Sequence, residues 1–142
     1  METVPPIAPY KAFPQSLIII DDSVGSILFS PSKRNPFVNF YIRSRHLGTS
    51  IILSTQHWGG LNKVLRANAT FFVLFNLNDK KQLYLIYLEL AHTMDFEQFL
   101  NIIHYATGDR YNFLFIDIEK NIISKNFLQE ILNKDEFINN TP

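Results

Sequence analysis

Leu17-Ile18-Ile19-Ile20-Asp21-Asp22 decides the expected fold of this chain, because four aliphatic residues run directly into two adjacent carboxylates. An apolar run this short, rich in isoleucine and bounded by Pro14 and Gly25, predicts a strand that is buried on both faces of a sheet. Acidic residues at the carboxyl end of such a strand lie at the edge of a parallel sheet, where open α/β folds bind their ligands. The stretch therefore predicts an α/β fold and the place of its site.

The composition indicates a single soluble domain with a substantial core. The chain has 142 residues, of which 46% are hydrophobic and 18% are charged, so it is neither disordered nor strongly solvated. Lys plus Arg and Asp plus Glu both number 13, and this balance gives no overall attraction to nucleic acid or to a membrane surface. The absence of cysteine, of a signal peptide and of an apolar run of ~20 residues favours an intracellular protein outside the membrane.

Predicted strands and helices alternate along the rest of the chain. Further strands are expected over residues 49–56, 71–77 and 111–118, and helices over residues 35–48, 61–67, 79–91, 95–105 and 127–132. Asn35-Pro36 predicts the start of the first helix and Gly48 its end, and Asp79 and Asp95 are the expected caps of two later helices. This alternation predicts a parallel sheet that helices cover on both faces. Residues 1–14 are expected to form an irregular, proline-rich leader, residues 15–138 one domain or part of one, and residues 139–142 a frayed end.

Asp21 and Asp22 are the first candidates for chemistry. Neighbouring strand residues point to opposite faces, so the two carboxylates can share a task only if the strand ends there. In nucleotide hydrolases an aliphatic strand ending in two acids is the Walker B pattern, in which the first acid helps to hold Mg²⁺ through water and the second orients or deprotonates the attacking water. The pair could instead cap a loop or bind Lys33 or Arg34, and the pattern alone leaves both interpretations open.

Polar and cationic candidates follow on the next predicted elements. Gln56 ends the second strand, where its side chain could contact a γ-phosphate or the attacking water, or could complete a turn. Arg45, late in the helix before that strand, could reach a nucleotide in a neighbouring subunit and stabilise charge in the transition state. Its alternative role is that of a cation at a helix C-terminus. Arg66 is a secondary arginine candidate with weaker placement.

Together these motifs resemble the genome-packaging ATPases of large DNA viruses and virophages, which belong to the FtsK–HerA group of P-loop motors. The shared pattern is an aliphatic strand ending in two acids, an Arg-His pair, and a strand ending in Thr-Gln. It corresponds here to Ile18-Ile19-Ile20-Asp21-Asp22-Ser23 and Arg45-His46-Leu47-Gly48-Thr49-Ser50-Ile51-Ile52-Leu53-Ser54-Thr55-Gln56. Residues 66–69 and 111–117 also look similar, so the resemblance spans roughly residues 15–120.

The resemblance implies a three-layer, RecA-like P-loop NTPase core with a mostly parallel sheet, part of which would lie in residues 15–138. It implies ATP hydrolysis coupled to the translocation of double-stranded viral DNA into a capsid. By this likeness Asp21 and Asp22 are the Walker B acids, and Asp21 holds Mg²⁺ through water. Gln56 is the sensor, these three residues contact ATP, and Arg45 is the trans-acting arginine finger.

The resemblance also implies partners and a location. Double-stranded DNA, a homo-oligomeric ring (a pentamer or a hexamer) or a complementing P-loop half, and capsid proteins are the expected partners, with no membrane. The expected location is the host cytoplasm, a virus factory or the virion.

The chain departs from this family at the phosphate-binding loop. No Gly-x-x-x-x-Gly-Lys-Ser/Thr occurs in the sequence, which holds five glycines. Without backbone amides and a lysine around the β- and γ-phosphates, tight ATP binding is not expected. The sequence therefore predicts the C-terminal half of an ATPase that lacks its P-loop βα unit. Such a half is expected to be inactive alone, to use ATP and Mg²⁺ only with a P-loop supplied elsewhere, and to expose strand edges where that unit should pack.

Three other interpretations compete with this one. The chain could be a catalytically inactive binding or assembly subunit derived from such an ATPase. A response-regulator receiver also starts with paired acids, but it needs an acid after its third strand, where this chain has Phe75-Asn76-Leu77. A two-metal nuclease would need more acids near the pair, and Asp117 is the obvious partner.

Overall fold

A computed structural model describes residues 16–22, 35–91 and 94–133. The chain divides between Asn68 and Ala69 into two compact units, each of which has its own sheet. The predicted leader (1–14) and frayed end (139–142) lie outside the described residues, as do Lys33 and Arg34.

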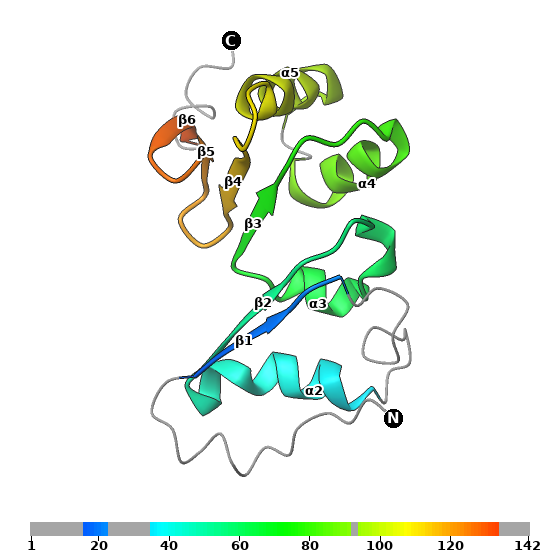
Figure 1. Cartoon of the computed structure of the whole chain (residues 1–142), viewed down its shortest axis with the longest axis vertical. Helices are drawn as coiled ribbons and strands as arrows, with labels where there is room; N and C mark the ends of the chain where they lie inside the picture. Colours follow the sequence, from blue (N-terminus) through cyan, green and yellow to red (C-terminus); the bar gives the residue numbers. More distant parts are fainter. Residues whose placement is uncertain (1–15, 23–34, 92–93, 134–142) are drawn as a thin grey trace. The chain divides into compact units, whose positions relative to one another are not determined.

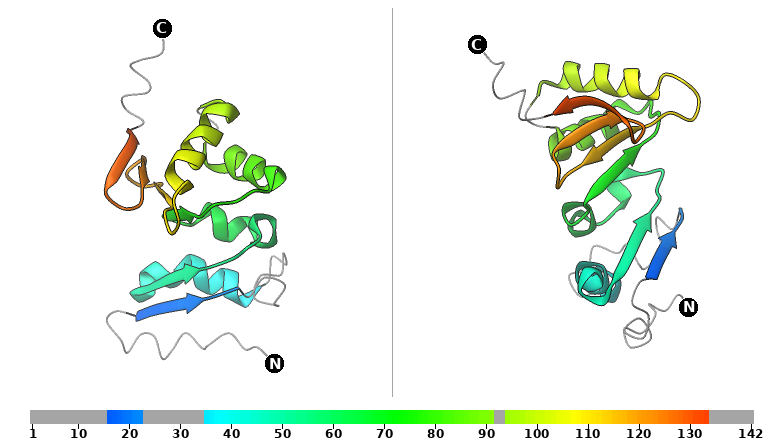
Figure 2. Two further views of the ribbon diagram at one scale, coloured as in Figure 1. Left: turned by 45° about the horizontal axis from the view of Figure 1, so that its top comes forward. Right: turned by 90° about the vertical axis from the view of Figure 1, so that its left-hand side faces the viewer.

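The first unit contains a parallel pair of strands. Its elements are β1 (Ser16–Ile20), α2 (Pro36–Arg43), η2 (Ser44–Leu47), β2 (Thr49–Leu53), η3 (Trp58–Gly60) and α3 (Lys63–Ala67). β1 pairs with β2 from Ser16 opposite Thr49 to Ile20 opposite Leu53 (Figure 1). Parallel strands need a crossover connection, and α2 and η2 lie in that connection. Both views of Figure 2 show α2 along one side of the pair.

Local signals set the helix boundaries, as expected from the sequence. The Asn35 side chain accepts a hydrogen bond from the Phe37 amide at 2.9 Å, and Pro36 is the first residue of the helix. Both features favour the start of α2 at Pro36. Gly48, at φ 65°, ends η2 in the left-handed region that glycine adopts without a steric penalty. Asp79 and Asp95 cap the two helices of the second unit. The hydrogen bonds that Asp79 accepts, first from the Gln82 side chain, lower its pKa below the usual value.

The core of the first unit lies on one face of the β1–β2 pair. Phe37, Val38 and Phe40 of α2 are buried with Leu65 of α3, and the alternate strand residues Ile18, Ile20, Ile51 and Leu53 pack against them. Leu17 and Ile19 point to the opposite face and are exposed. The prediction that this strand is buried on both faces is therefore wrong, because no element among the described residues covers the second face.

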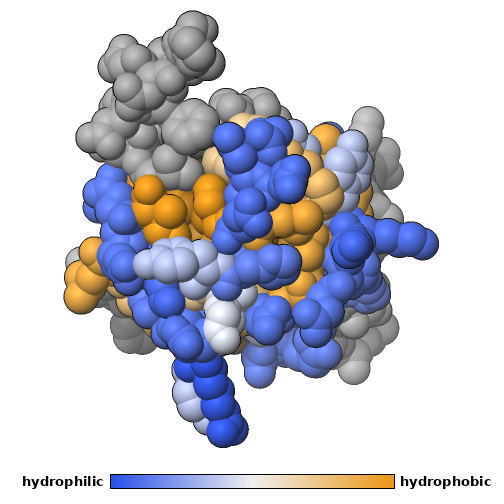
Figure 3. Space-filling model, turned by 90° about the horizontal axis from the view of Figure 1, so that it is seen from above, coloured by the Kyte–Doolittle hydropathy of each residue, from blue (hydrophilic) through white to orange (hydrophobic). Residues whose placement is uncertain are grey.

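The second unit is an antiparallel sheet with two helices. Its elements are β3 (Phe71–Leu74), α4 (Lys80–Leu90), α5 (Phe96–Thr107), β4 (Leu114–Asp117), β5 (Ile122–Lys125) and β6 (Gln129–Asn133). The strands pair in the order β3-β4-β5-β6. Leu114 and Ile116 of β4 are buried on the face that contacts α5. The view of Figure 3, from above the molecule, shows hydrophilic residues interspersed with hydrophobic ones on the visible surface.

Five phenylalanines form a connected cluster in the second unit. Their ring centroids lie 4.9–5.8 Å apart, and the members are Phe71, Phe75, Phe113, Phe115 and Phe127. Phe71, Phe75 and Phe127 remain exposed. Antiparallel sheets commonly leave one face in water, so this exposure needs no further element to explain it.

Two predictions about this region are wrong. Residues 127–132 were expected to be helical, but they belong to the β5–β6 hairpin. Asn126 adopts φ 54°, in the left-handed region that asparagine tolerates. Its side-chain oxygen accepts a hydrogen bond from the Phe113 amide at 3.2 Å, so the chain turns back here. The sheet was also expected to be mostly parallel. Among the described strands β1 and β2 pair in parallel, whereas β3, β4, β5 and β6 pair with one another in antiparallel fashion.

None of the helices in the described part of the chain is long and apolar enough to cross a membrane.

Replacing Phe40 with alanine should lower the free energy of unfolding of the first unit by about 3–5 kcal/mol, because Phe40 is 2% exposed and its removal leaves a cavity. The fluorescence of Trp58, the single tryptophan, reports this unit during urea denaturation. Val64→Ala, at an exposed position of α3, is the control and should change stability by less than about 0.5 kcal/mol. Equal midpoints for the two variants would contradict the described core.

Candidate functional site

The candidate site lies where β1 and β2 end together. The Ser54 amide donates to the Ile20 carbonyl at 2.9 Å, and the Asp22 amide donates to the Ser54 carbonyl at 3.2 Å. The two chains thus stay paired beyond the last strand residues. This pairing places the acids that follow β1 beside the polar residues that follow β2.

Gln56 and Asp22 meet at this edge. The Gln56 Nε2 donates to the Asp22 Oδ2 at 2.9 Å, although the residues are 34 positions apart in the sequence. An ionised acceptor makes such a bond stronger than one between neutral groups. Both side chains are exposed, so a ligand at this edge can reach them. The structure therefore brings together two of the residues that the sequence singles out.

The strand ends before the acidic pair. β1 stops at Ile20, and Asp22 adopts φ 44°, in the left-handed region that aspartate tolerates better than most residues. Strict alternation of side chains between the two faces therefore does not continue through Asp21 and Asp22. This removes the geometric objection to a shared task for the two carboxylates.

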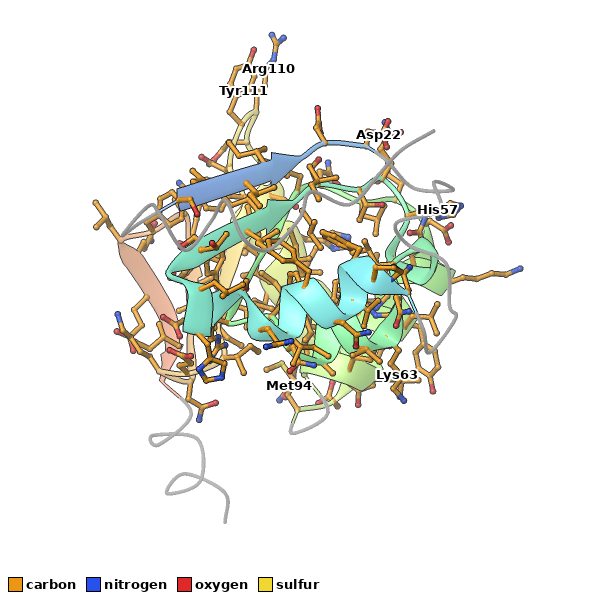
Figure 4. The ribbon with its side chains drawn as sticks, turned by 90° about the horizontal axis from the view of Figure 1, so that it is seen from below. Asp22, His57, Lys63, Met94, Arg110 and Tyr111 are labelled. Atoms are coloured by element: carbon orange, nitrogen blue, oxygen red, sulfur yellow. The ribbon has the colours of Figure 1, made fainter. Side chains whose placement is uncertain are left out.

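A tight turn follows Gln56. The His57 amide donates to the Thr55 Oγ1 at 2.9 Å, and Trp58 after it is buried. His57 is exposed, and Figure 4 shows it toward the same end of the β1–β2 pair as Asp22. His57 was not among the candidates singled out from the sequence, and its position directly after Gln56 is the signal that could have placed it at this edge.

Arg45 lies at the other edge of the strands. It belongs to η2, which precedes β2, and the Ser16 amide donates to the Gly48 carbonyl at 3.1 Å to fix this edge. The five residues of β2 separate the two edges by about 16 Å. Burial raises the pKa of Tyr41, and the nearby Arg45 guanidinium partly offsets that rise. Within one chain Arg45 therefore does not join Asp22, and its action on a neighbouring subunit stays a prediction.

Arg66 holds the turn before α3. Its Nη1 donates to the Trp58 carbonyl at 2.9 Å and also to the Leu61 carbonyl, and its guanidinium lies 5.4 Å from the centre of the Trp58 ring. These contacts suffice to explain an arginine at this position. Its role as a secondary arginine finger stays a prediction.

Asp117 and a pocket lie in the second unit. The Asp117 carboxylate accepts a hydrogen bond from the Lys120 amide at 2.9 Å, which closes the turn after β4. A pocket of about 470 Å³ is lined by Phe75, Asn76 and residues 107–112, and none of the predicted site residues belongs to it. The described residues contain no group of three or more His, Asp or Glu side chains that could hold a metal ion. The assignment of Mg²⁺ to Asp21 stays a prediction.

No protein-family model and no curated protein sequence matches the chain. Its structure is similar to the genome-packaging NTPase B204 from Sulfolobus turreted icosahedral virus 2 in complex with ATP-gammaS, with a TM-score of 0.66 and 22% identity over 84% of this chain and 55% of that chain. The complex of B204 with AMPPCP matches with a TM-score of 0.65 and 21% identity over 84% and 57%. The DNA-packaging ATPase B204 from Sulfolobus turreted icosahedral virus matches with a TM-score of 0.66 and 21% identity over 84% and 55%.

These similarities confirm the predicted resemblance to viral packaging ATPases at the level of the fold. The chain spans about 55% of the first of these structures. The described strands form a mixed α/β fold, with a parallel pair and an antiparallel sheet, which is compatible with that match.

Proposed function

We propose that this chain is the C-terminal, Walker B half of a viral DNA-packaging ATPase. The observation that carries the proposal is the 2.9 Å hydrogen bond from Gln56 to Asp22 at the carboxyl edge of two parallel strands. Open α/β folds bind ligands at this edge. The similarity in fold to a genome-packaging NTPase that binds ATP-gammaS and AMPPCP supports the same assignment.

Each residue has a distinct task in this proposal. Asp21 helps to hold Mg²⁺ through water, since carboxylate oxygens are the ligands that this ion prefers. Asp22 orients the attacking water and accepts its proton, and the Gln56 amide keeps the Asp22 carboxylate in place. The amide oxygen of Gln56 can accept a hydrogen bond from the same water. When bound beside Asp21, Mg²⁺ would supply positive charge against the charge that develops on the γ-phosphate.

The edge cannot hold the phosphates of ATP by itself. It presents two exposed carboxylates, and anionic phosphates repel such groups unless amides and a cation surround them. The sequence holds no Gly-x-x-x-x-Gly-Lys-Ser/Thr motif to supply those groups. We therefore infer that this chain binds ATP and Mg²⁺ only when a P-loop is supplied elsewhere.

A ring of subunits accounts for the position of Arg45. Arg45 precedes β2 and the acids lie beyond the other end of the pair, so the length of β2, about 16 Å, keeps Arg45 away from a nucleotide at the acids of its own chain. In a homo-oligomeric pentamer or hexamer the same arginine can face the nucleotide of the next subunit. Copies of this ATPase are therefore proposed partners, beside a complementing P-loop half. The resemblance to packaging ATPases adds double-stranded DNA and capsid proteins, and the host cytoplasm, a virus factory or the virion as the location.

The second candidate is a catalytically inactive, ATPase-derived assembly subunit. The missing phosphate-loop motif favours it. The two candidates differ in one outcome: only the ATPase half gains hydrolysis when a P-loop segment is added.

Asp22→Asn should lower ATP hydrolysis by the reconstituted ATPase about 10²–10⁴-fold, because the amide cannot accept the proton of the attacking water. Phosphate release from the chain mixed with a P-loop segment measures this rate. Asp109→Asn removes an exposed carboxylate in the second unit and serves as the control, with an unchanged rate expected. An unchanged rate for Asp22→Asn would remove its assigned role.

Arg45→Ala should lower hydrolysis by the ring about 10³-fold and leave nucleotide affinity nearly unchanged, because the arginine acts on the transition state in the next subunit. Arg43→Ala removes another exposed cation two residues earlier and is the matched control. Fluorescent nucleotide titrations and phosphate release separate the two effects. If Arg45→Ala abolishes nucleotide binding, Arg45 contacts the bound nucleotide or supports the fold instead.

Arg66→Ala should lower the free energy of unfolding of the first unit by about 1–3 kcal/mol, since it removes the donor to two backbone carbonyls. Arg66→Lys should not restore it, because lysine lacks the planar fork of donors. Trp58 fluorescence during urea denaturation measures both, with Lys63→Ala on the exposed side of α3 as the control. A variant of unchanged stability that loses hydrolysis would make Arg66 the arginine finger.

A further inference from the structure

A pocket in the second unit shares no residue with the edge formed by Asp22 and Gln56. Phe75 and Asn76 follow β3, and they line the pocket together with residues 107–112, from the end of α5 to the loop before β4. Its volume is about 470 Å³, within the ~300–1,000 Å³ that small-molecule sites occupy. The pocket is therefore large enough for one small ligand.

Two aromatic residues of the pocket are exposed to water. Tyr111 is 78% exposed and Phe75 is 61% exposed, although burial would stabilise rings of this size. Tyr111 also adopts φ 70°, a left-handed conformation that is uncommon for a bulky residue and that gathers at ligand-binding sites. These rings are surfaces on which a planar ligand can stack.

The Arg110 guanidinium lies beside the Tyr111 ring. Its central carbon is 4.9 Å from the centre of the ring, and Figure 4 shows the two side chains projecting together from the ribbon. Within the described part of the chain Arg110 makes no ion pair, whereas Lys125 pairs with the neighbouring Asp109 at 3.3 Å. The uncompensated charge at the pocket is thus positive, and the planar fork of a guanidinium suits the oxygens of a phosphate.

Hydrogen bonds hold the loop that carries Arg110 and Tyr111. The Asn112 Nδ2 donates to the Asp109 Oδ2 at 3.2 Å, and the Asn126 Nδ2 donates to the Asn112 Oδ1 at 3.1 Å. Asn126 lies between β5 and β6, so these bonds tie the loop to that hairpin. A loop that is already ordered loses little conformational entropy when a ligand binds.

These groups match the parts of an unpaired nucleotide. Bases stack on aromatic side chains and on arginine planes, and their edges form hydrogen bonds with amides such as that of the exposed Asn76. In a duplex the neighbouring bases cover these faces, and duplex binding depends on many cations along the phosphate backbone. Among the described residues that line the pocket, Arg110 is the single cation, which is enough for one phosphate. The pocket therefore favours a single nucleotide over a duplex.

We propose that this pocket binds one unpaired nucleobase together with its phosphate. The base stacks on Tyr111, with Phe75 as the second ring of the site, and the Asn76 amide forms hydrogen bonds with the edge of the base. Arg110 holds the phosphate. This inference goes beyond the proposed function, which assigns no residue of the second unit to any ligand. The base belongs either to a single-stranded nucleic acid or to a free nucleotide, and the chemistry of recognition is the same for both.

The test is a titration of the 142-residue chain into a fluorescein-labelled oligothymidylate of about eight nucleotides, followed by fluorescence anisotropy. Tyr111→Ala should weaken binding about 5–100-fold, because it removes the ring on which the base stacks. Tyr111→Phe keeps the ring and should stay within about twofold of the wild type. Tyr84→Ala removes an exposed ring of α4 outside the pocket and should leave the affinity unchanged. Melting curves from circular dichroism show that the variants stay folded.

The salt dependence of the same titration tests the phosphate contact. Arg110→Gln should lower the slope of log affinity against log salt concentration by about 0.7, the value for one phosphate of a single strand. Lys120→Gln removes an exposed cation that pairs with Asp117 outside the pocket, and it should leave the slope unchanged. An unchanged slope for Arg110→Gln would contradict the role of Arg110 in the proposal.

Competition with unlabelled AMP identifies the source of the base. If AMP displaces the oligothymidylate and binds with the same dependence on Tyr111, the ligand is a free nucleotide, whereas displacement by single strands alone indicates a nucleic acid. The proposal is overturned if neither probe binds at millimolar concentration, or if Tyr111→Ala binds both as tightly as the wild type. Equal competition by a duplex of the same sequence would also overturn it, because the bases of a duplex are already stacked.

Discussion

The candidate site depends on the parallel pairing of β1 with β2. The register that sets Ile20 opposite Leu53 continues through the hydrogen bonds of Ser54 and Asp22 beyond the strand ends. A shift of one residue would turn the side chains of a strand to the other face and would separate Gln56 from Asp22. The contact between these two side chains is therefore a consequence of the sheet register, and the register is held by the apolar residues that pack under α2.

The same pairing divides the first unit into two ends with different chemistry. The carboxyl end presents Asp21, Asp22 and Gln56, and the amino end carries Arg45 in η2. In a parallel pair these groups lie at opposite ends of the strands, so the side chains of a single chain cannot bring them together. Catalysis that uses both ends requires a second subunit, and catalysis on ATP also requires a phosphate cradle. The roles proposed for these residues therefore call for a second subunit and a phosphate cradle from elsewhere.

Local sequence signals predicted much of the fold. The Asn35-Pro36 start of α2, the Gly48 stop of η2 and the caps at Asp79 and Asp95 are side-chain and backbone effects confined to a few residues, and the structure confirms them. The helix predicted over residues 127–132 is wrong, because the left-handed turn at Asn126 and pairing with β5 decided that segment. Periodicity alone does not show such pairing.

Long-range features were predicted less well. Isoleucine in the first strand indicated burial on both faces, but composition cannot tell whether the covering element lies among the residues at hand, and Ile19 is exposed. The proximity of Asp22 and Gln56 was predictable from two apolar strands that each end in polar residues. The tasks of these residues, of Arg45 and of Arg66 rest on the family resemblance and stay predictions.

The proposal that this chain forms only part of an ATP site is tested most directly by its affinity for Mg-ATP, measured for the 142-residue chain alone and with a P-loop segment. Two exposed carboxylates without a phosphate cradle should give no micromolar binding, whereas the complex should bind nucleotide in that range. Micromolar affinity for the chain alone would contradict the account, because the phosphates would then be held by groups that this account does not identify.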